Sequence, residues 1–234
     1  MIPIFIITRD RLTTLQRSIA SYLKLVDVEI ILLDNGSTYP PLLEWMNSCG
    51  FKIIRNPTPT GTFRDISQWI GETIKEYMNS SPSEFYIVTD PDIELCNPSP
   101  ELLTYYKAVL GAYSAAACVG PMLRIDDLPE CFHFRDQMIH SHMIQFWDET
   151  KHKRILFRNV NIQPAWIDTT FAMYRKNFYF RRLNIGIRVH DPYWAWHLDW
   201  YMDTLNLTPE QQYYKDHATD ISTMSMHLRK GGMG

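Results

Sequence analysis

Two aspartates, Asp90 and Asp92, flank a proline at the end of an apolar run in the stretch FYIVTDPDIEL, Phe85 to Leu95. Pro91 fixes its own φ angle and holds the two carboxylates on a rigid extended turn. Carboxylates held this close repel each other unless a cation lies between them, and Mg²⁺ or Mn²⁺ accepts oxygen ligands of this kind. We therefore predict that the pair binds a divalent cation, which would in turn hold a diphosphate. The simpler alternative is a turn or a helix cap without a ligand.

Two further polar clusters also follow apolar runs. Thr8 to Arg11 come after the run 2–7, and Asp34 to Ser37 end the run that starts at Val28. These runs are rich in β-branched residues and predict strands, while apolar residues recur at helical spacing between them. Alternating strands and helices favour an α/β domain with a largely parallel sheet flanked by helices. Ligands bind at the carboxyl ends of strands in such a sheet, so we expect the three clusters to share one edge.

The remaining elements continue the pattern less regularly. Thr208, Pro209 and Gln211 supply an N-cap, a first helical residue and a capping box. The other predicted elements are, in chain order, helix 12–23, helix 40–50, strand 51–56, loop 57–62, helix 63–77, strand 85–92, helix 99–114, strand 115–125, amphipathic helix 130–151, strand, turn and strand over 159–175, and a helix beginning at 199.

The composition indicates one sizeable globular domain, or one domain with a small appendage, and we treat 1–234 as one domain that the resemblance given below divides into halves at 1–97 and 98–234. The chain has 234 residues, 45% of them hydrophobic. Its net charge of −3 excludes the overall basic field of a nucleic-acid-binding protein, so any phosphate must be held locally. The four cysteines lack metal-ligand or disulfide spacing, which predicts reduced thiols and a cytoplasmic location. We expect neither a signal sequence nor a membrane span, because the apolar runs are too short.

The second half carries its own candidates for chemistry. Asp168 lies in the apolar stretch WIDTTFAMYR, where an unpaired carboxylate is costly. The stretch RVHDPYWAWHLDWYMD packs two histidines and three aspartates among five aromatic side chains, of which we expect two to face a sugar. A carboxylate or imidazole near such aromatic faces can take the proton of an attacking hydroxyl. These candidates are His190, Asp191, His197 and Asp199, among Tyr193, Trp194, Trp196, Trp200 and Tyr201.

The stretches IPIFIITRDR, IILLDNGST, PTGTFRD and FYIVTDPDIEL resemble, in order and spacing, glycosyltransferases of the GT-A fold. The likeness is to the small glycosyltransferase domains of large algal viruses and their bacterial relatives. It implies that the first half binds a nucleotide sugar and that the D-x-D motif holds Mn²⁺ or Mg²⁺ on its diphosphate. The implied nucleotide-sugar site comprises Thr8 and Arg9 at the base pocket, Arg11, Asp34 on the base, Asn35, Gly36 and Ser37 in its turn, Arg64 and Asp65, Asp90 on the ribose and the metal, and Asp92 on the metal.

The same resemblance implies roles in the second half. In the family the catalytic base often begins a helix in this region, which Asp199 fits best, with Asp191 and Asp168 behind it. His197 would bind phosphate or acceptor. A late histidine is a common extra metal ligand, a role that His227 would take and that favours Mn²⁺ over Mg²⁺.

The resulting hypothesis is the transfer of a sugar from a nucleotide diphosphate donor, with UDP favoured, to a hydroxyl of a glycan or glycoprotein. Inversion would need a base and retention would not, and the sequence leaves both open. A sugar nucleotidyltransferase is a weaker alternative, because TRDRLTT lacks the glycine-rich signature expected after the first strand. A nucleotide- or glycan-binding module without catalysis is the third. A viral source would imply the host cytoplasm.

Overall fold

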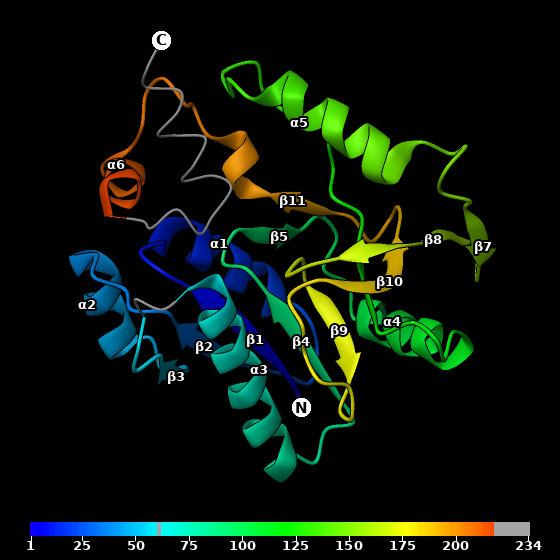
Figure 1. Ribbon diagram of the computed structural model, residues 1–234, viewed down its shortest axis with the longest axis horizontal. Coiled ribbons are helices and arrows are strands. Elements are labelled where there is room, and N and C mark those ends of the chain that lie inside the picture. Colours follow the sequence, from blue (N-terminus) through cyan, green and yellow to red (C-terminus); the bar gives the residue numbers. More distant parts are fainter. Residues whose placement is uncertain (60–61, 218–234) are drawn as a thin grey trace.

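The structure is a computed structural model that describes residues 1–59 and 62–217. A nine-stranded sheet forms its centre, in the order β3-β2-β1-β4-β9-β6-β10-β8-β7 (Figure 1). A separate two-stranded ribbon pairs β5 (Ile93–Leu95) with β11 (Ala195–His197). The strands of the large sheet are β1 (Ile2–Thr8), β2 (Val28–Asp34), β3 (Lys52–Arg55), β4 (Phe85–Thr89), β6 (Cys118–Pro121), β7 (Ile155–Phe157), β8 (Val160–Ile167), β9 (Ala172–Arg175) and β10 (Asn184–Val189).

The first four strands of the chain that enter this sheet are all parallel. β1 pairs in parallel with β2 and β4, and β2 pairs in parallel with β3. β9 is antiparallel to both β4 and β6, and β8 is antiparallel to both β10 and β7. With β10 parallel to β6, seven of the nine described strands run one way and only β8 and β9 run the other. The predicted α/β class with a mixed, largely parallel sheet flanked by helices is confirmed.

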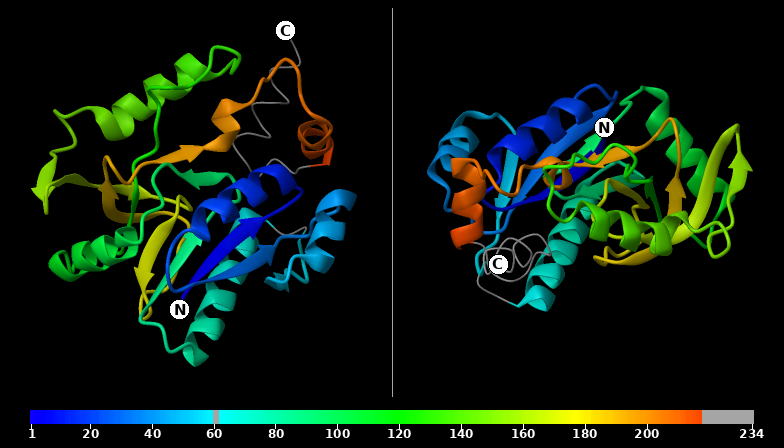
Figure 2. Two further views of the ribbon diagram at one scale, coloured as in Figure 1. Left: turned by 180° about the vertical axis from the view of Figure 1, so that it is seen from behind. Right: turned by 90° about the horizontal axis from the view of Figure 1, so that it is seen from above.

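Helices cover both faces of the sheet, as opposite views show (Figures 1 and 2). Leu15, Ile19 and Tyr22 of α1 pack into one buried cluster together with α2 and α4, while Ile70 and Ile74 of α3 pack into a cluster on the other face. β1 is buried along its whole length because helices lie on both sides of it. The helices are α1 (Leu12–Tyr22), α2 (Pro40–Ser48), α3 (Phe63–Ser80), α4 (Glu101–Ala112), α5 (Arg135–His142), the π-helical η1 (Met143–Trp147), the 3₁₀ η2 (Leu198–Tyr201) and α6 (Pro209–His217).

Several local predictions are confirmed and one is wrong in part. The capping box of α6 forms, since Thr208 N donates to Gln211 Oε1 at 2.8 Å and Gln211 N donates to Thr208 Oγ1 at 3.3 Å. The single amphipathic helix expected at 130–151 is instead the short α5 followed by η1. No residue of α5 or η1 is fully buried, so packing against the core does not stabilise one long regular helix there.

Other features bear on the kind of protein. The short strands β5, β7, β10 and β11 are not among the predicted elements. All four cysteines are free thiols, as predicted. Within the described ranges, no helix is long and apolar enough to cross a membrane.

Candidate active site

A cavity of about 1040 Å³ opens at the carboxyl edge of the parallel strands. β1, β2 and β4 are neighbours in the sheet, so the three predicted polar clusters do share one edge. α5 and η1 form the facing wall of the cavity. Ten of the predicted site residues line it: Thr8, Arg9, Arg11, Asn35, Arg64, Asp90, Asp92, Asp168, His197 and Asp199.

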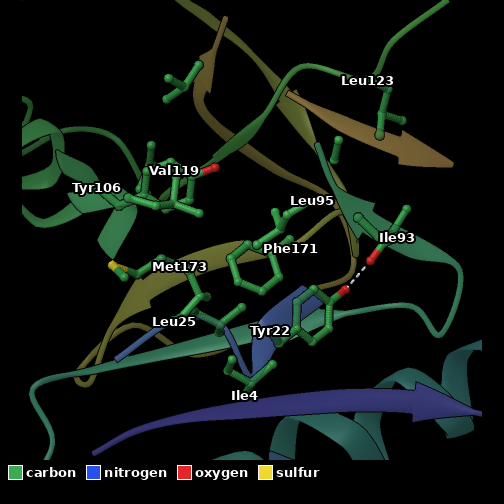
Figure 3. Packing of buried hydrophobic residues seen from close by; sticks show 14 of the residues in the cluster. Ile4, Tyr22, Leu25, Ile93, Leu95, Tyr106, Val119, Leu123, Phe171 and Met173 are labelled. Carbon is green, nitrogen blue, oxygen red and sulfur yellow. Dashed lines mark hydrogen bonds between the residues drawn. The ribbon is translucent and has the colours of Figure 1, made fainter. Parts of the chain in front are cut away.

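The turn that carries Asp90 and Asp92 is held from below by α1. Ser18 Oγ donates to the carbonyl of Pro91 at 3.0 Å. The buried hydroxyl of Tyr22 donates to the carbonyl of Ile93, and its ring packs on Phe171 at 4.7 Å (Figure 3). Buried polar groups are costly unless they form hydrogen bonds, so these contacts fix the position of the turn relative to α1.

The β5–β11 ribbon brings two further side chains to Asp92. His197 is paired with Ile93, and Leu198 N donates to the Asp92 carbonyl at 2.7 Å. Ligand atoms of Asp92, His197 and Asp199 therefore lie within 4.8 Å of one another. His197 ends a strand and Asp199 lies in η2, so both side chains reach the same aspartate.

This cluster contains two buried atoms that lack partners. Asp92 Oδ1 and His197 Nδ1 form no hydrogen bond with the described residues, although Asp92 Oδ2 lies 3.6 Å from that nitrogen. Buried polar atoms are almost always paired, so unpaired ones point to a missing ligand. Carboxylate oxygens and an imidazole nitrogen together suit a divalent ion such as Mn²⁺. The donor set thus fits the expected cation, with His197 and Asp199 as ligands beside Asp92.

Asp199 also belongs to a buried ion pair. Both of its carboxylate oxygens accept hydrogen bonds from the guanidinium of Arg11, which lies 188 residues earlier in the chain. Arg11 also stacks over the ring of Tyr214 at 4.7 Å. Each carboxylate oxygen keeps a second lone pair, so this pairing does not prevent Asp199 from binding a cation.

Asp90 is held differently from Asp92. Its carboxylate accepts a hydrogen bond from Thr169 Oγ1 and lies 3.7 Å from the guanidinium of Arg182. Burial raises the pKa of Asp90 to about 6, and the negative charge of Asp92 acts in the same direction, while Arg182 opposes them. Asp90 is not part of the group of ligand atoms around Asp92.

Other predicted residues of the first half fall into two groups. Thr8, Arg9, Asn35 and Arg64 line the cavity, and Arg9 Nε and Nη1 are buried without hydrogen-bond partners among the described residues. Asp34, Ser37 and Asp65 shape the backbone instead and do not line it. Their bonds are Ser37 N to Asp34 Oδ1 at 2.9 Å, Asp10 N to Ser37 Oγ at 3.1 Å, and Thr62 N to Asp65 Oδ2 at 2.8 Å.

The turn after β2 depends on a glycine. Gly36 has a φ of +75°, and a Cβ there would lie 2.3 Å from Pro59. Asp34 Oδ1 accepts from the backbone amide of Ser37, three residues later, and so closes the turn. The turn therefore presents Asn35 to the cavity and keeps Asp34 buried behind it, 3.5 Å from the guanidinium of Arg55.

In the second half the candidates for the base differ in access. Asp168 lines the cavity and is exposed, so its expected apolar setting is wrong: the strand β8 ends before it and the side chain faces open space. Asp191 is exposed and does not line the cavity. His190 is buried and bonds Gln163 through Nε2 at 2.9 Å. His227 lies outside the described residues.

Of the five aromatic residues in the dense stretch, one lines the cavity rather than the two expected. Trp200 lies there, stacked on His197 with ring centroids 4.5 Å apart. Trp196 and Tyr201 donate to Asp127 on the outside of the ribbon. Their polar edges are satisfied there, which explains why they do not turn inward.

Three lining residues escaped sequence analysis: His142, Arg182 and Arg188. His142 Nδ1 donates to the Met138 carbonyl at 3.2 Å, and burial lowers its pKa to about 4. Mixed periodicity around 130–151 gave no reason to place this histidine at a site. Arg188 lies in a strand that the apolar pattern did not predict, so no sequence signal marked it.

Comparisons with known proteins found no matching family model and no matching curated protein. Among solved structures, residues 1–349 of TarS from S. aureus match at 12% identity with a TM-score of 0.45, over 99% of this chain and 72% of that one. Glucosyl-3-phosphoglycerate synthase from Mycobacterium tuberculosis, in complex with Mn²⁺ and UDP-glucose, matches at 16% identity and 0.39. That match covers 75% of this chain and 56% of the synthase.

A further mycobacterial protein matches at 14% identity and a TM-score of 0.41, over 81% of this chain and 65% of that one. The chain thus spans little more than half of the mycobacterial synthase and about two thirds of this second protein. At such identities and TM-scores, the ligands and activities of these proteins are theirs alone.

Proposed function

We propose that the chain is a metal-dependent glycosyltransferase of the GT-A type that uses a nucleotide diphosphate sugar. The observation that carries the proposal is the Asp92, His197 and Asp199 cluster, with two buried unpartnered ligand atoms, in a cavity at the carboxyl edge of parallel strands. The four stretches that resemble GT-A enzymes supply the class of reaction. The division into a donor half, 1–97, and an acceptor half, 98–234, is part of the proposal.

Asp92, His197 and Asp199 would hold Mn²⁺ or Mg²⁺. Bound there, the cation would supply positive charge against the charge that grows on the leaving diphosphate. Arg11 keeps the Asp199 carboxylate oriented toward the cluster through two hydrogen bonds. Asp90 and His227 remain candidates for further ligands.

The donor would lie along the strand ends of the first half. Arg9 brings two unpartnered guanidinium nitrogens to the cavity, and Arg64 and Arg182 add positive charge. These groups suit the oxygens of a diphosphate. Thr8 and Asn35 line the same side and would contact the nucleoside. Asp34, Ser37 and Asp65 would act by holding the turns. UDP as the nucleotide is proposed on the resemblance.

The acceptor hydroxyl would lose its proton to Asp168 if the reaction inverts the anomeric centre. Asp168 is exposed to the cavity and forms no ion pair with the described residues, whereas the oxygens of the buried Asp199 accept from Arg11 and would also hold the cation. A base needs a free lone pair within reach of the proton that it takes. A glycan or glycoprotein remains the proposed acceptor, and the cytoplasm, or a host cytoplasm for a viral chain, the proposed location.

Calorimetric titration of the purified chain with UDP and with GDP, each with Mn²⁺ and with EDTA, tests the proposal. We expect UDP to bind only with the metal and then to support hydrolysis or transfer of a UDP-sugar. Failure of both nucleotides to bind with Mn²⁺ would refute the proposal. Metal-dependent binding without any turnover across UDP-sugars and glycan acceptors would instead identify a binding module.

A pair of variants tests the assignment of the base. Asp168→Asn should lower turnover by about 10²- to 10⁴-fold, the usual contribution of general base catalysis, and leave UDP affinity unchanged. Asp199→Asn should weaken metal-dependent UDP binding as well. Full turnover by Asp168→Asn would remove the base from that position and point to Asp199 or to a retaining reaction.

A further inference from the structure

Arg188 of β10 is a buried cation on the cavity wall without a carboxylate partner. Its residue is 3% exposed, and it lines the cavity. Arginine is almost never so deeply buried unless it is paired. Arg188 forms no ion pair with a carboxylate of the described residues, although several carboxylates, including that of Asp168, line the same cavity. A buried unpaired charge is costly, so this arginine has a ligand to meet.

Neutral groups orient this guanidinium without neutralising it. Nε donates to the Trp166 carbonyl and Nη1 to the Pro121 carbonyl, both at 3.0 Å, and Nη1 reaches Thr170 Oγ1 at 3.5 Å. The guanidinium also lies 4.4 Å from the centre of the Phe146 ring. Nη2 donates to none of the described residues. Burial lowers the pKa of Arg188 below its usual value, and the nearby Asp168 opposes that shift.

Two other arginines that line the cavity, Arg182 and Arg11, already have carboxylate partners. Arg182 lies 3.7 Å from Asp90 and so belongs with the D-x-D turn. Arg11 is held by Asp199. Arg188 alone among these three is fixed on two sides by backbone carbonyls and keeps Nη2 free. The two N–H groups of Nη2 can donate charge-assisted hydrogen bonds to an oxygen of a phosphate or a carboxylate.

The partners of Arg188 also separate it from the donor side. Its carbonyl and hydroxyl partners belong to β6, β8 and the segment after β8, and Phe146 belongs to η1, all within 98–234. Arg9, whose Nε lies 3.8 Å from Asp10, instead follows β1, beside the strand ends that would hold the nucleotide. The two cations therefore serve different walls of one cavity.

We propose that Arg188 binds an anionic group, a phosphate or a carboxylate, carried by the acceptor. This inference rests on the proposed glycosyltransferase function, which it sharpens from any hydroxyl-bearing acceptor to an acidic one. Asp168 lines the same cavity two residues before Thr170, so one wall would hold both the anionic group and the hydroxyl of the acceptor.

The test uses the chain saturated with UDP and Mn²⁺, so that the donor diphosphate site is filled. Sodium sulfate, a tetrahedral oxyanion like phosphate, and sodium acetate are titrated calorimetrically at constant ionic strength kept with sodium chloride. We expect saturable binding of sulfate, acetate or both. Arg188→Gln should weaken it by roughly 10- to 100-fold, the loss of a charge-assisted hydrogen bond, and leave UDP affinity unchanged. Arg188→Lys should fall between, because it keeps the charge and loses the fork.

Arg9→Gln is the matched control, and it should weaken UDP binding while leaving anion binding to the UDP-loaded chain intact. Absence of saturable binding of both anions to the UDP-loaded wild type would overturn the inference, even if Arg188→Gln does not fold. Equal weakening of UDP and anion binding by Arg188→Gln would also overturn it, by assigning Arg188 to the donor. Anion binding through Arg188 in a chain that binds no nucleotide would refute the glycosyltransferase proposal and keep the anion site.

Discussion

The charged groups of the cavity come from two regions that position them by different means. One is the edge, formed by the ends of β1, β2 and β4 in the first half, and the other is the wall, formed by residues of the second half. At the edge, Thr8 ends β1, Asn35 follows β2 and Asp90 follows β4, and these strands are neighbours in a parallel array. At the wall, His197 and Asp199 reach the site through a three-residue ribbon, and Arg188 through its bonds to β6 and β8. The edge is built from short-range sequence signals, whereas the wall depends on contacts between distant segments.

The two regions also differ in charge. The edge brings Asp90 and Asp92 close together and leaves Asp92 Oδ1 unpartnered. The wall contributes a cation without a carboxylate partner and the half-buried histidine His142. An unpaired anion on one side and an unpaired cation on the other suit two ligands of opposite charge, a metal and an oxyanion.

The largest expected effect comes from Asp92→Asn. The substitution removes the one carboxylate of the edge that faces both His197 and Asp199. We expect metal-dependent UDP affinity to fall by ~100-fold or more, beyond the 10- to 100-fold that loss of an outer-shell partner costs. Calorimetric titration with UDP in the presence of Mn²⁺ measures the UDP affinity, and the electron paramagnetic resonance signal of free Mn²⁺ measures the binding of the metal.

Asp191→Asn is the matched control, since this aspartate is exposed and does not line the cavity. It should bind UDP and Mn²⁺ like the wild type. Unchanged Mn²⁺ binding by Asp92→Asn would show that the cation does not bind at the Asp92, His197 and Asp199 cluster. The difference in charge between the edge and the wall would then not reflect a metal site.

A smaller effect is expected from Arg11→Met, which breaks the ion pair that joins the two regions. Arg11 and Asp199 have side chains 7% and 2% exposed, so the variant leaves a buried carboxylate unpaired. Loss of one partner of a buried pair typically costs about 3–5 kcal/mol of unfolding free energy. Urea denaturation measures it, and Mn²⁺ should restore part of the loss by giving Asp199 a new partner.

Arg17→Met provides the comparison, because Arg17 of α1 pairs with Glu94 of β5 at 2.5 Å while its side chain is 55% exposed. Exposed pairs contribute about 0–1 kcal/mol, so this variant should be close to the wild type. Equal losses for the two variants would mean that burial does not set the cost of the Arg11 pair. The double variant Arg11→Met with Asp199→Leu should be more stable than Arg11→Met alone.

The contrast between the regions explains what sequence analysis could predict. Apolar runs ending in polar residues mark β1, β2 and β4, and a parallel sheet necessarily brings such ends together, so the shared edge was predictable. β5 and β11 are three residues each, too short for a periodicity signal, so the meeting of His197 with Asp92 was not. Asp34 and Asp65 look like site residues by type, yet hydrogen bonds within their own turns use them. Whether such an aspartate faces the cavity or bonds within its own turn depends on local backbone geometry.

The regions should also differ in their response to acid. Burial lowers the pKa of His190 from 6.5 to about 4, so the unfolded chain takes up a proton at a higher pH than the folded one. The stability that this histidine contributes is therefore present above about pH 6.5 and is lost as the pH falls toward 4. Asp90 acts oppositely: its pKa is raised to about 6, so its contribution is complete below 3.8 and is lost as the pH rises through 6.

His190→Gln isolates the contribution of the wall. The loss of unfolding free energy between pH 6.5 and 4 should shrink by an amount on the order of 2–3 kcal/mol relative to the wild type. Urea denaturation at a series of pH values measures the profile, and His133→Gln, at an exposed histidine, is the control. A profile of His190→Gln that parallels the wild type would place the acid sensitivity elsewhere.

The smallest expected effect concerns a cap that one region supplies to the other. Both carboxylate oxygens of Glu210 in α6 accept from Thr13 N, at 3.1 and 3.0 Å, and Oε2 also accepts from Thr13 Oγ1 at 3.1 Å. Thr13 lies in the first turn of α1, whose own N-cap residue makes no side-chain cap. Glu210→Ala should therefore cost about 1 kcal/mol, as the loss of an N-cap does, and Glu210→Gln only a few tenths, because one acceptor remains.

The cap matters because α1 supports the D-x-D turn through Ser18 and Tyr22. Loosening its first turn should lower UDP affinity slightly, and the loss should grow with urea at concentrations below the unfolding transition. Glu101→Ala, in the first turn of α4 and exposed, is the control. If Glu210→Ala behaves like that control in both stability and UDP affinity, then the second region does not brace the first through the Glu210 contact with α1.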